Sequence, residues 1–127
     1  MIPKFRAYDS GSLCRMYSPE EVMVENGNIW ILDEDDVAGE WIVNNDLHLM
    51  QSTGLTDKNG KEIFEGDVVK MAKNVYSEPT YYEVVRHRGG AYRLESKQHG
   101  CELWLRHTDC EIAGNIYENP ELEEVCS

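Results

Sequence analysis

The sequence predicts an all-β fold made of antiparallel strands joined by tight turns. Residues 47–70 hold two apolar, extended runs separated by turn-forming residues such as Asn59-Gly60. Residues 91–96 alternate apolar and polar side chains, which is typical of a half-buried strand. Apolar residues nowhere keep the spacing of an amphipathic helix over three turns. Together these observations indicate a sheet built from linked hairpins.

The first half predicts one hairpin, one acidic loop and one further strand. Two apolar runs, residues 22–25 and 28–32, flank Asn26-Gly27, a dipeptide that tolerates the positive φ angles of a type I′ turn. Residues 33–36 are all acidic, and adjacent carboxylates repel one another in a strand, so these residues predict a loop. Residues 41–43 resume extended structure.

The central segment predicts two strands and two turns. Residues 47–52 form the first strand, and Thr53-Gly54 is predicted to end it. Residues 57–60 supply an Asn-Gly turn, and residues 65–67 lead the chain into the apolar strand 68–71. Because the turn residues have a sufficient backbone explanation, a structural role is favoured over a binding role for both turns.

The last part predicts a second hairpin, formed by residues 81–86 and 91–96, and two later strands. Residues 101–106 alternate and are predicted to form one of them. Three side chains of this strand are expected to face the core: Cys101, Leu103 and Leu105. The other three are expected to face away from it: Glu102, Trp104 and Arg106. Residues 110–113 are predicted to close the sheet.

Three blocks of sequence carry a resemblance to a known family. They are residues 4–9 (KFRAYD), residues 49–69, which hold TGL, DKNGKEI and EGD, and residues 114–122 (GNIYENPEL). These blocks resemble the YopX family of phage and prophage proteins. The resemblance implies a single YopX-like domain over residues 1–127, in which an N-terminal β-hairpin region packs on an SH3-like barrel. A subdivision into residues 1–46 and 47–127 stays open. The resemblance implies no enzymatic activity.

The charge and composition of the chain limit the classes of partner that we expect it to bind. The chain has 127 residues, with 12 Lys and Arg against 24 Asp and Glu, which gives a net charge of −12. This surplus disfavours broad nucleic-acid binding and favours basic partners. No window approaches the roughly 18 apolar residues of a membrane span, so no membrane partner is expected. The absence of a leader pattern predicts a protein of the host bacterial cytoplasm with reduced thiols; a homo-oligomer stays open.

A metal site is not expected, although four suitable side chains lie within a dozen residues, namely His99, Cys101, His107 and Cys110. If residues 101–106 form a strand, its ends lie roughly 17 Å apart, too far for one tetrahedral zinc ion. A nucleophilic cysteine is equally disfavoured, since none lies at an evident helix N-terminus or in a basic loop. We therefore predict no metal, no cofactor and no catalytic residues.

The sequence nevertheless suggests one candidate surface. Six basic and aromatic residues of the second half are predicted to bind a macromolecule: Tyr82, Arg86, Arg88, Arg93, Trp104 and Arg106. If the strands 81–88, 91–96 and 101–106 are neighbours, Arg86 or Arg88 is expected to share an exposed sheet face with Arg93, Trp104 and Arg106. The alternative interpretation is structural. It pairs Arg93 and Arg106 with Glu95 and Glu102 across strands, and it covers Trp104.

Together, these features predict a non-enzymatic accessory protein of a phage or prophage that binds a host or phage macromolecule. The favoured partner is a protein with a basic surface. The second hypothesis is a nucleic-acid-binding module that uses the Arg and Trp face locally. The third, a metal-dependent enzyme, rests only on the His and Cys residues named above.

Overall fold

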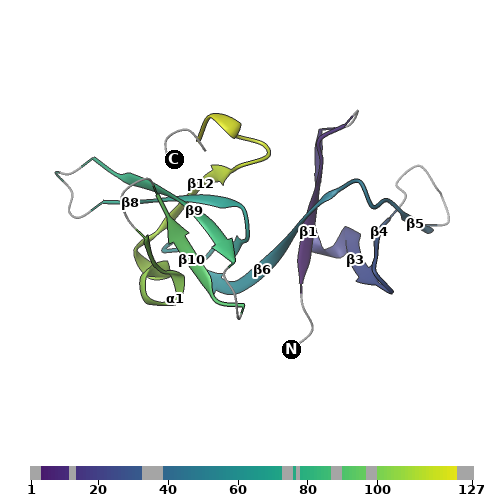
Figure 1. The fold of residues 1–127 in the computed structure, drawn as a ribbon, viewed down its shortest axis with the longest axis horizontal. Helices are drawn as coiled ribbons and strands as arrows, with labels where there is room; N and C mark the ends of the chain where they lie inside the picture. The colour runs from purple at the N-terminus through teal and green to yellow at the C-terminus, as the bar shows by residue number, and fades with distance from the viewer. Residues whose placement is uncertain are drawn as a thin grey trace. The chain divides into compact units, whose positions relative to one another are not determined.

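The computed structural model describes residues 4–11, 14–32, 39–72, 76, 78–86, 90–96 and 100–122. Within these residues the chain is mostly antiparallel β-structure, so the predicted all-β class is confirmed (Figure 1). The chain divides into two units, Met1–Ser52 and Thr53–Ser127, which we describe separately. No helix in the described part of the chain is long and apolar enough to cross a membrane.

The first unit contains two small antiparallel sheets. One consists of β2 (Arg15–Tyr17), β1 (Phe5–Asp9) and the beginning of β6 (His48–Thr56), in that order. The other has the order β3-β4-β5, with bounds Val22–Glu25, Asn28–Leu32 and Trp41–Val43. Side chains from both sheets form the core of this unit, with Ala7, Tyr17, Val22, Ile31 and Leu47 all buried.

The predicted hairpin is confirmed, with β3 and β4 as its arms. Asn26 and Gly27 have φ angles of 53° and 78°, the left-handed values that this turn requires. Val24 pairs with Ile29, and Ile31 in turn pairs with Ile42 of the predicted third strand, β5. The predicted acidic loop, residues 33–36, lies outside the described residues.

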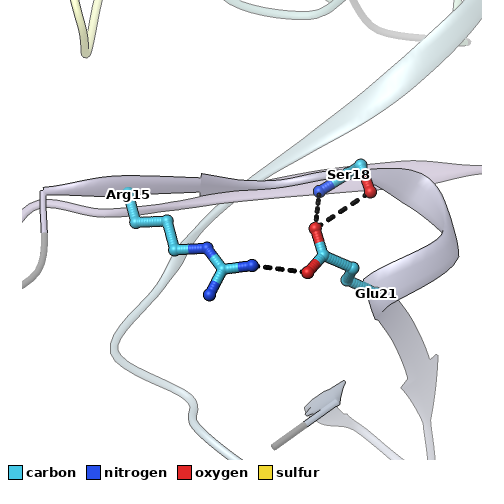
Figure 2. Close-up of polar contacts among 3 residues, drawn as sticks. All are labelled: Arg15, Ser18 and Glu21. Atoms are coloured by element: carbon cyan, nitrogen blue, oxygen red, sulfur yellow. Dashed lines mark hydrogen bonds and ion pairs between the residues drawn. The ribbon is translucent and has the colours of Figure 1, made fainter. Parts of the chain in front are cut away.

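A short 3-10 turn, Pro19–Glu21, links β2 to β3 and is fixed by one carboxylate. One oxygen of Glu21 accepts hydrogen bonds from the backbone N–H and the hydroxyl of Ser18, at 3.1 and 3.0 Å. The other oxygen pairs with Arg15 at 2.5 Å, as Figure 2 shows. The guanidinium of Arg15 also lies 4.4 Å from the ring centre of Tyr17. These contacts set the direction in which the chain enters β3.

The second unit is built on a five-stranded antiparallel sheet in the order β11-β10-β9-β8-β12. Its strands are β8 (Asp67–Met71), β9 (Thr80–Arg86), β10 (Tyr92–Glu95), β11 (Gly100–Glu102) and β12 (Glu111–Asn115). β7 (Glu62–Phe64) pairs with β6. Two short helical turns, α1 (Leu103–Arg106) and η2 (His107–Asp109), connect β11 to β12.

The core of the second unit lies on one face of this sheet. Its buried side chains are Ile63, Val69, Met71, Tyr82, Val84, Leu94, Leu103 and Cys110. The register explains the pattern, because Val84 pairs with Leu94 and Val69 pairs with Tyr82, and directly paired residues lie on the same face. The predicted hairpin of residues 81–86 and 91–96 is confirmed by this pairing.

One predicted strand end is wrong. Thr53-Gly54 was expected to end the central strand, but β6 continues to Thr56, with Gly54 at a φ of 77°. The hydroxyl of Thr53 donates to the carbonyl of Ile63 in the neighbouring strand at 2.7 Å, and it accepts from the N–H of Leu55 at 3.2 Å. This side chain therefore bridges the irregular backbone at the glycine, so pairing resumes beyond it.

Candidate functional site

The predicted strand 101–106 is wrong beyond Glu102, and this changes the candidate surface. Leu103–Arg106 forms a single helical turn instead. β11 and β12 lie at opposite edges of the five-stranded sheet, so the residues between them must cross it. Leu103 and Cys110 are fully buried at the two ends of this crossing. Packing of these two side chains, rather than strand pairing, decides the local conformation.

The helical turn exposes two large apolar side chains in succession. Trp104 is 64% exposed, as predicted, and Leu105 is 58% exposed, although alternation placed it in the core. The alternative interpretation, in which Trp104 is covered, does not agree with this exposure. Of these two, Trp is the residue type that is enriched at the centres of protein interfaces, whereas Leu is under-represented among the residues that dominate binding energy.

The six residues of the predicted surface do not lie on one sheet face. Tyr82 is buried in the core, and burial raises the pKa of its hydroxyl. Arg86 pairs with Tyr92, whereas the adjacent Arg93 pairs with Val85, so the two arginines lie on opposite faces. Arg88 lies outside the described residues. The prediction of one common face is therefore wrong, and the binding role of these residues stays a prediction.

Each described arginine of this set has a carboxylate partner. Arg93 Nη1 lies 3.0 Å from Glu102 Oε1 on the neighbouring strand, as the structural interpretation predicted. Arg106 Nε lies 3.1 Å from Asp109 Oδ2, not from the predicted glutamates. Arg86 Nε lies 3.7 Å from Glu65 Oε2. These pairs are partly exposed and contribute about 0–1 kcal/mol each to stability, but they reduce the positive charge offered to a partner.

Cys101 and Cys110, the two cysteines of the predicted His and Cys set, do not offer reactive thiolates. Burial raises the pKa of Cys110 to about 12, and its Sγ donates to the carbonyl of Arg106 at 3.2 Å. Burial also raises the pKa of Cys101. His107 Nδ1 lies 2.8 Å from the carbonyl of Thr56, while His99 lies outside the described residues. Among the described residues, no three His, Cys, Asp or Glu side chains gather as a metal site would require.

The central motif has a structural function in the loop 57–61. Asp57 Oδ1 accepts hydrogen bonds from the N–H groups of Asn59 and Lys61, both at 2.9 Å. Its other oxygen accepts from the N–H of Ile112 in β12 at 3.0 Å. Asp67, in the EGD part of the motif, similarly accepts from the N–H of Phe64 at 2.8 Å. Both carboxylates are buried and used in holding backbone, so neither is available for catalysis.

The closing motif GNIYENPEL is also structural. A side chain at Gly114 would place its Cβ 2.4 Å from Asn119 Oδ1 and 2.9 Å from Leu122 Cδ1. Asn115 Oδ1 accepts from the N–H groups of Tyr117 and Glu118, at 3.0 and 2.8 Å. The residues after β12 therefore fold back tightly over its end, which only glycine at position 114 permits.

One charge pattern, not among the predictions from the sequence, extends from the first unit into the start of the second. Between Arg15 and Lys58 the sequence contains ten Asp or Glu residues and no Lys or Arg. Arg15 itself is paired with Glu21. The signal was present in the sequence, but we considered net charge over the whole chain and not its distribution.

Comparisons with known proteins agree with these motifs. The family model described as YopX protein matches residues 4–124, almost the whole chain. The chain belongs to the YopX family. The crystal structure of protein EF1440 from Enterococcus faecalis is similar, with 28% identity, a TM-score of 0.63, and coverage of 96% of this chain and 98% of that one. The crystal structure of YopX from Bacillus subtilis is similar at 17% identity and a TM-score of 0.66, with coverage of 94% and 96%. Proteins of curated function give no match.

Proposed function

We propose that this YopX-family chain is a non-enzymatic accessory protein of a phage or prophage that acts in the bacterial cytoplasm by binding a protein with a basic surface. The proposal rests on the excess of negative charge in the chain. The net charge is −12, and the residues between Arg15 and Lys58 include ten Asp or Glu and no Lys or Arg. Such a field attracts basic partners and accelerates their encounter at low salt.

The chemistry of the described side chains supports binding rather than catalysis. The thiols of Cys101 and Cys110 are protonated at neutral pH, because burial raises the pKa of both. The buried carboxylates of Asp57 and Asp67 are occupied by backbone N–H donors. A catalytic acid or nucleophile needs an accessible group with a pKa suited to its task, which none of these four offers.

The second hypothesis, a nucleic-acid-binding module, is less well supported by these contacts. Phosphate recognition needs Lys or Arg side chains that can release counterions from the backbone. Arg86, Arg93 and Arg106 each have a carboxylate within 4 Å. Of the residues predicted to bind, the exposed Trp104 remains suited to stacking on a base.

We also propose that residues 1–127 act as one YopX-like domain whose later part, residues 47–127, is similar to an SH3-like barrel. The match to the family model over residues 4–124 supports one family domain. The antiparallel order β11-β10-β9-β8-β12, with the apolar core on one face, is consistent with a strongly curved sheet.

Affinity capture from the native host, at two salt concentrations, tests the proposed function. A tagged copy is expected to retain one specific protein at about 0.01 M salt and to lose most of it at about 0.15 M, because the screening length falls from about 30 to about 8 Å. The recovered protein is then purified and titrated, and it should carry a basic surface and bind one to one. Recovery of no specific protein at low salt, or of an acidic one, contradicts the proposal. Recovery of nucleic acid alone supports the second hypothesis instead.

A further inference from the structure

The sheet β3-β4-β5 has one face in the core and a second apolar face that is only partly covered, although Nε1 of Trp30 on this second face is buried. Val22 and Ile31 are buried at 6% and 4% exposure, and they pair directly with each other. Because successive side chains of a strand alternate, the strand residues directly next to Val22 and Ile31 lie on the opposite face. This opposite face, which we call the Trp30–Trp41 face, consists of Met23, Trp30, Leu32, Trp41 and Val43.

The side chains of the Trp30–Trp41 face form two rows across the sheet. Met23 pairs with Trp30, which pairs with Val43, so three apolar side chains follow one another across all three strands. Leu32 pairs with Trp41 in the next row. Directly paired residues lie about 4.5–5.5 Å apart, so these rows make one continuous surface. Met23 and Val43 are 36% and 44% exposed, and the other three are half-buried.

Acidic side chains without ion pairs border this face. Glu25 follows Met23 by two residues and lies on the same side of the sheet, and Glu40 is in the chain just before the first residue of β5. Both are exposed, and neither forms an ion pair with a described residue. The described residues of the sheet and its turns, 22–32 and 39–46, contain no basic side chain. An apolar centre with an acidic border is complementary to a segment that is apolar along one side and basic at its margins.

We infer that the Trp30–Trp41 face is the docking surface for a basic, amphipathic segment of a partner protein. The inference rests on the proposed function and gives its binding site a position. Trp30 on the central strand, Trp41 on an edge strand and the acidic Glu25 nearby match the usual anatomy of an interface, in which aromatic residues are enriched in the buried part. A second copy of the chain is a poor occupant, since two faces with the same acidic border repel each other. Nucleic acid is a poor occupant for the same reason.

A peptide titration with a matched pair of variants tests the inference. The probe is a synthetic peptide with Leu at i, i+3, i+4 and i+7 and Lys at the other positions, and the control peptides carry Glu for Lys or Ser for Leu. Trp104→Phe serves as the background, so that indole fluorescence reports only Trp30 and Trp41. The Leu and Lys peptide is expected to shift this emission to the blue at low salt, and both control peptides are expected to bind at least about tenfold more weakly.

Val43→Glu and Ile42→Glu locate the binding. The two residues are neighbours on β5 with nearly equal exposure, 44% and 43%, but they lie on opposite faces. Both variants add one negative charge, which would strengthen a purely electrostatic attraction to a basic peptide. If the peptide docks on the Trp30–Trp41 face, Val43→Glu weakens binding at least about tenfold, whereas Ile42→Glu leaves it equal or tighter. Circular dichroism and thermal unfolding confirm that both variants are folded.

The possible outcomes separate the inference from the proposed function. Binding that survives Val43→Glu, or that is lost in Trp104→Ala, places the peptide elsewhere; it overturns the inference and leaves the proposed function intact. Equal binding of the Leu and Glu peptide overturns the partner chemistry. No binding of any peptide at low salt overturns the inference, and the host capture then decides the proposed function. Sedimentation of the wild type as a dimer that Val43→Glu dissociates assigns the face to a second copy and also overturns it.

Discussion

The carboxylate of Asp57 and the backbone N–H of Ile112, 55 positions apart in the chain, form a hydrogen bond of 3.0 Å. The same carboxylate holds the N–H groups of Asn59 and Lys61. The carbonyl of Cys110 also accepts from the N–H of Lys58 at 2.9 Å, so side chain and backbone both join the loop 57–61 to the last strand. Burial acts to raise the pKa of Asp57, but the three backbone donors outweigh it, and the pKa is lowered below 3.8.

We expect Asp57→Asn to lower the free energy of unfolding by about 1–3 kcal/mol at neutral pH. An amide offers one acceptor oxygen and turns N–H donors toward a backbone donor, so at least one of the three hydrogen bonds is lost. Urea unfolding followed by circular dichroism measures the change. Asp109→Asn, an exposed carboxylate on a turn, is the matched control and should change stability by less than about 0.5 kcal/mol. Equal effects of the two substitutions would contradict this account.

The pH dependence of the free energy of unfolding, compared between wild type and Asp57→Asn, gives a second prediction. Because the folded-state pKa of Asp57 is lowered, its stabilising effect is fully present above the unfolded-state value. It is lost as the pH falls from about 4 through the lower folded-state pKa. The stability difference between wild type and Asp57→Asn should therefore shrink below about pH 4. A difference that stays constant down to about pH 2 would show that the carboxylate charge plays no part.

Gly114→Ala should destabilise the second unit by about 1–3 kcal/mol. The new Cβ would lie 2.4 Å from Asn119 Oδ1 and 2.8 Å from its Cγ, and Asn119 is itself bonded to the backbone of Asn115. Gly100→Ala is the control, since its nearest neighbour is the terminal Nη2 of Arg93 at 3.0 Å, the far end of a flexible side chain. Thermal unfolding should show the larger loss for Gly114→Ala. A reversed order would sink the steric explanation.

The helical turn at residues 103–106 predicts different costs for two neighbouring leucines. Leu103→Ala should cost about 2–5 kcal/mol of unfolding free energy, because this side chain is fully buried in the core. Leu105→Ala and Trp104→Ala should each cost less than about 0.5 kcal/mol, because both side chains are mostly exposed. A strand in place of the turn would bury Leu105 together with Leu103, and the two leucine variants would then cost similar amounts.

Alkylation should distinguish the described cysteines. At about pH 8 a thiol with a pKa of about 12 is ionised in roughly one molecule in ten thousand, and Cys110 is also fully buried. Cys14, which is exposed, should therefore react with iodoacetamide far faster than Cys110. Peptide mass spectrometry over a time course follows both sites, and unfolding in urea should bring the two rates together. Modification of Cys110 as fast as Cys14 in the folded protein would contradict the buried position.

Local turn chemistry was predictable from the sequence because it depends on few residues. Asn26-Gly27 requires left-handed φ angles, and the hairpin formed where that dipeptide stands. The turn predicted at Asn59-Gly60 also forms, but there only Gly60, with a φ of 81°, has a left-handed conformation. Strand alternation placed Tyr92 and Leu94 on one face of residues 91–96, and Leu94 is buried while Tyr92 packs against the same core.

The path of residues 103–110 was not predictable, because it depends on sheet order. Cys-Glu-Leu-Trp-Leu-Arg fits a strand by alternation, and such short runs do not distinguish a strand from a helical turn. What decides between them is that β12 pairs with β8 and not with β11. The predicted Arg and Trp surface failed for the same reason, since its geometry assumed a strand where the chain turns. Gly54 was misjudged because a neighbouring threonine restores the pairing that glycine interrupts.

The position of β8 in the interior of its sheet affects when the second unit can fold during synthesis. β8 comprises Asp67–Met71, yet one of its two neighbours, β12, is Glu111–Asn115. A nascent chain emerging from the ribosome therefore exposes one side of this apolar strand until Asn115 has been translated. Pairings between distant segments close slowly, because loop entropy must be overcome first. Folding of this unit is thus a late event, and the interval before β12 arrives is when the nascent chain is most prone to aggregation.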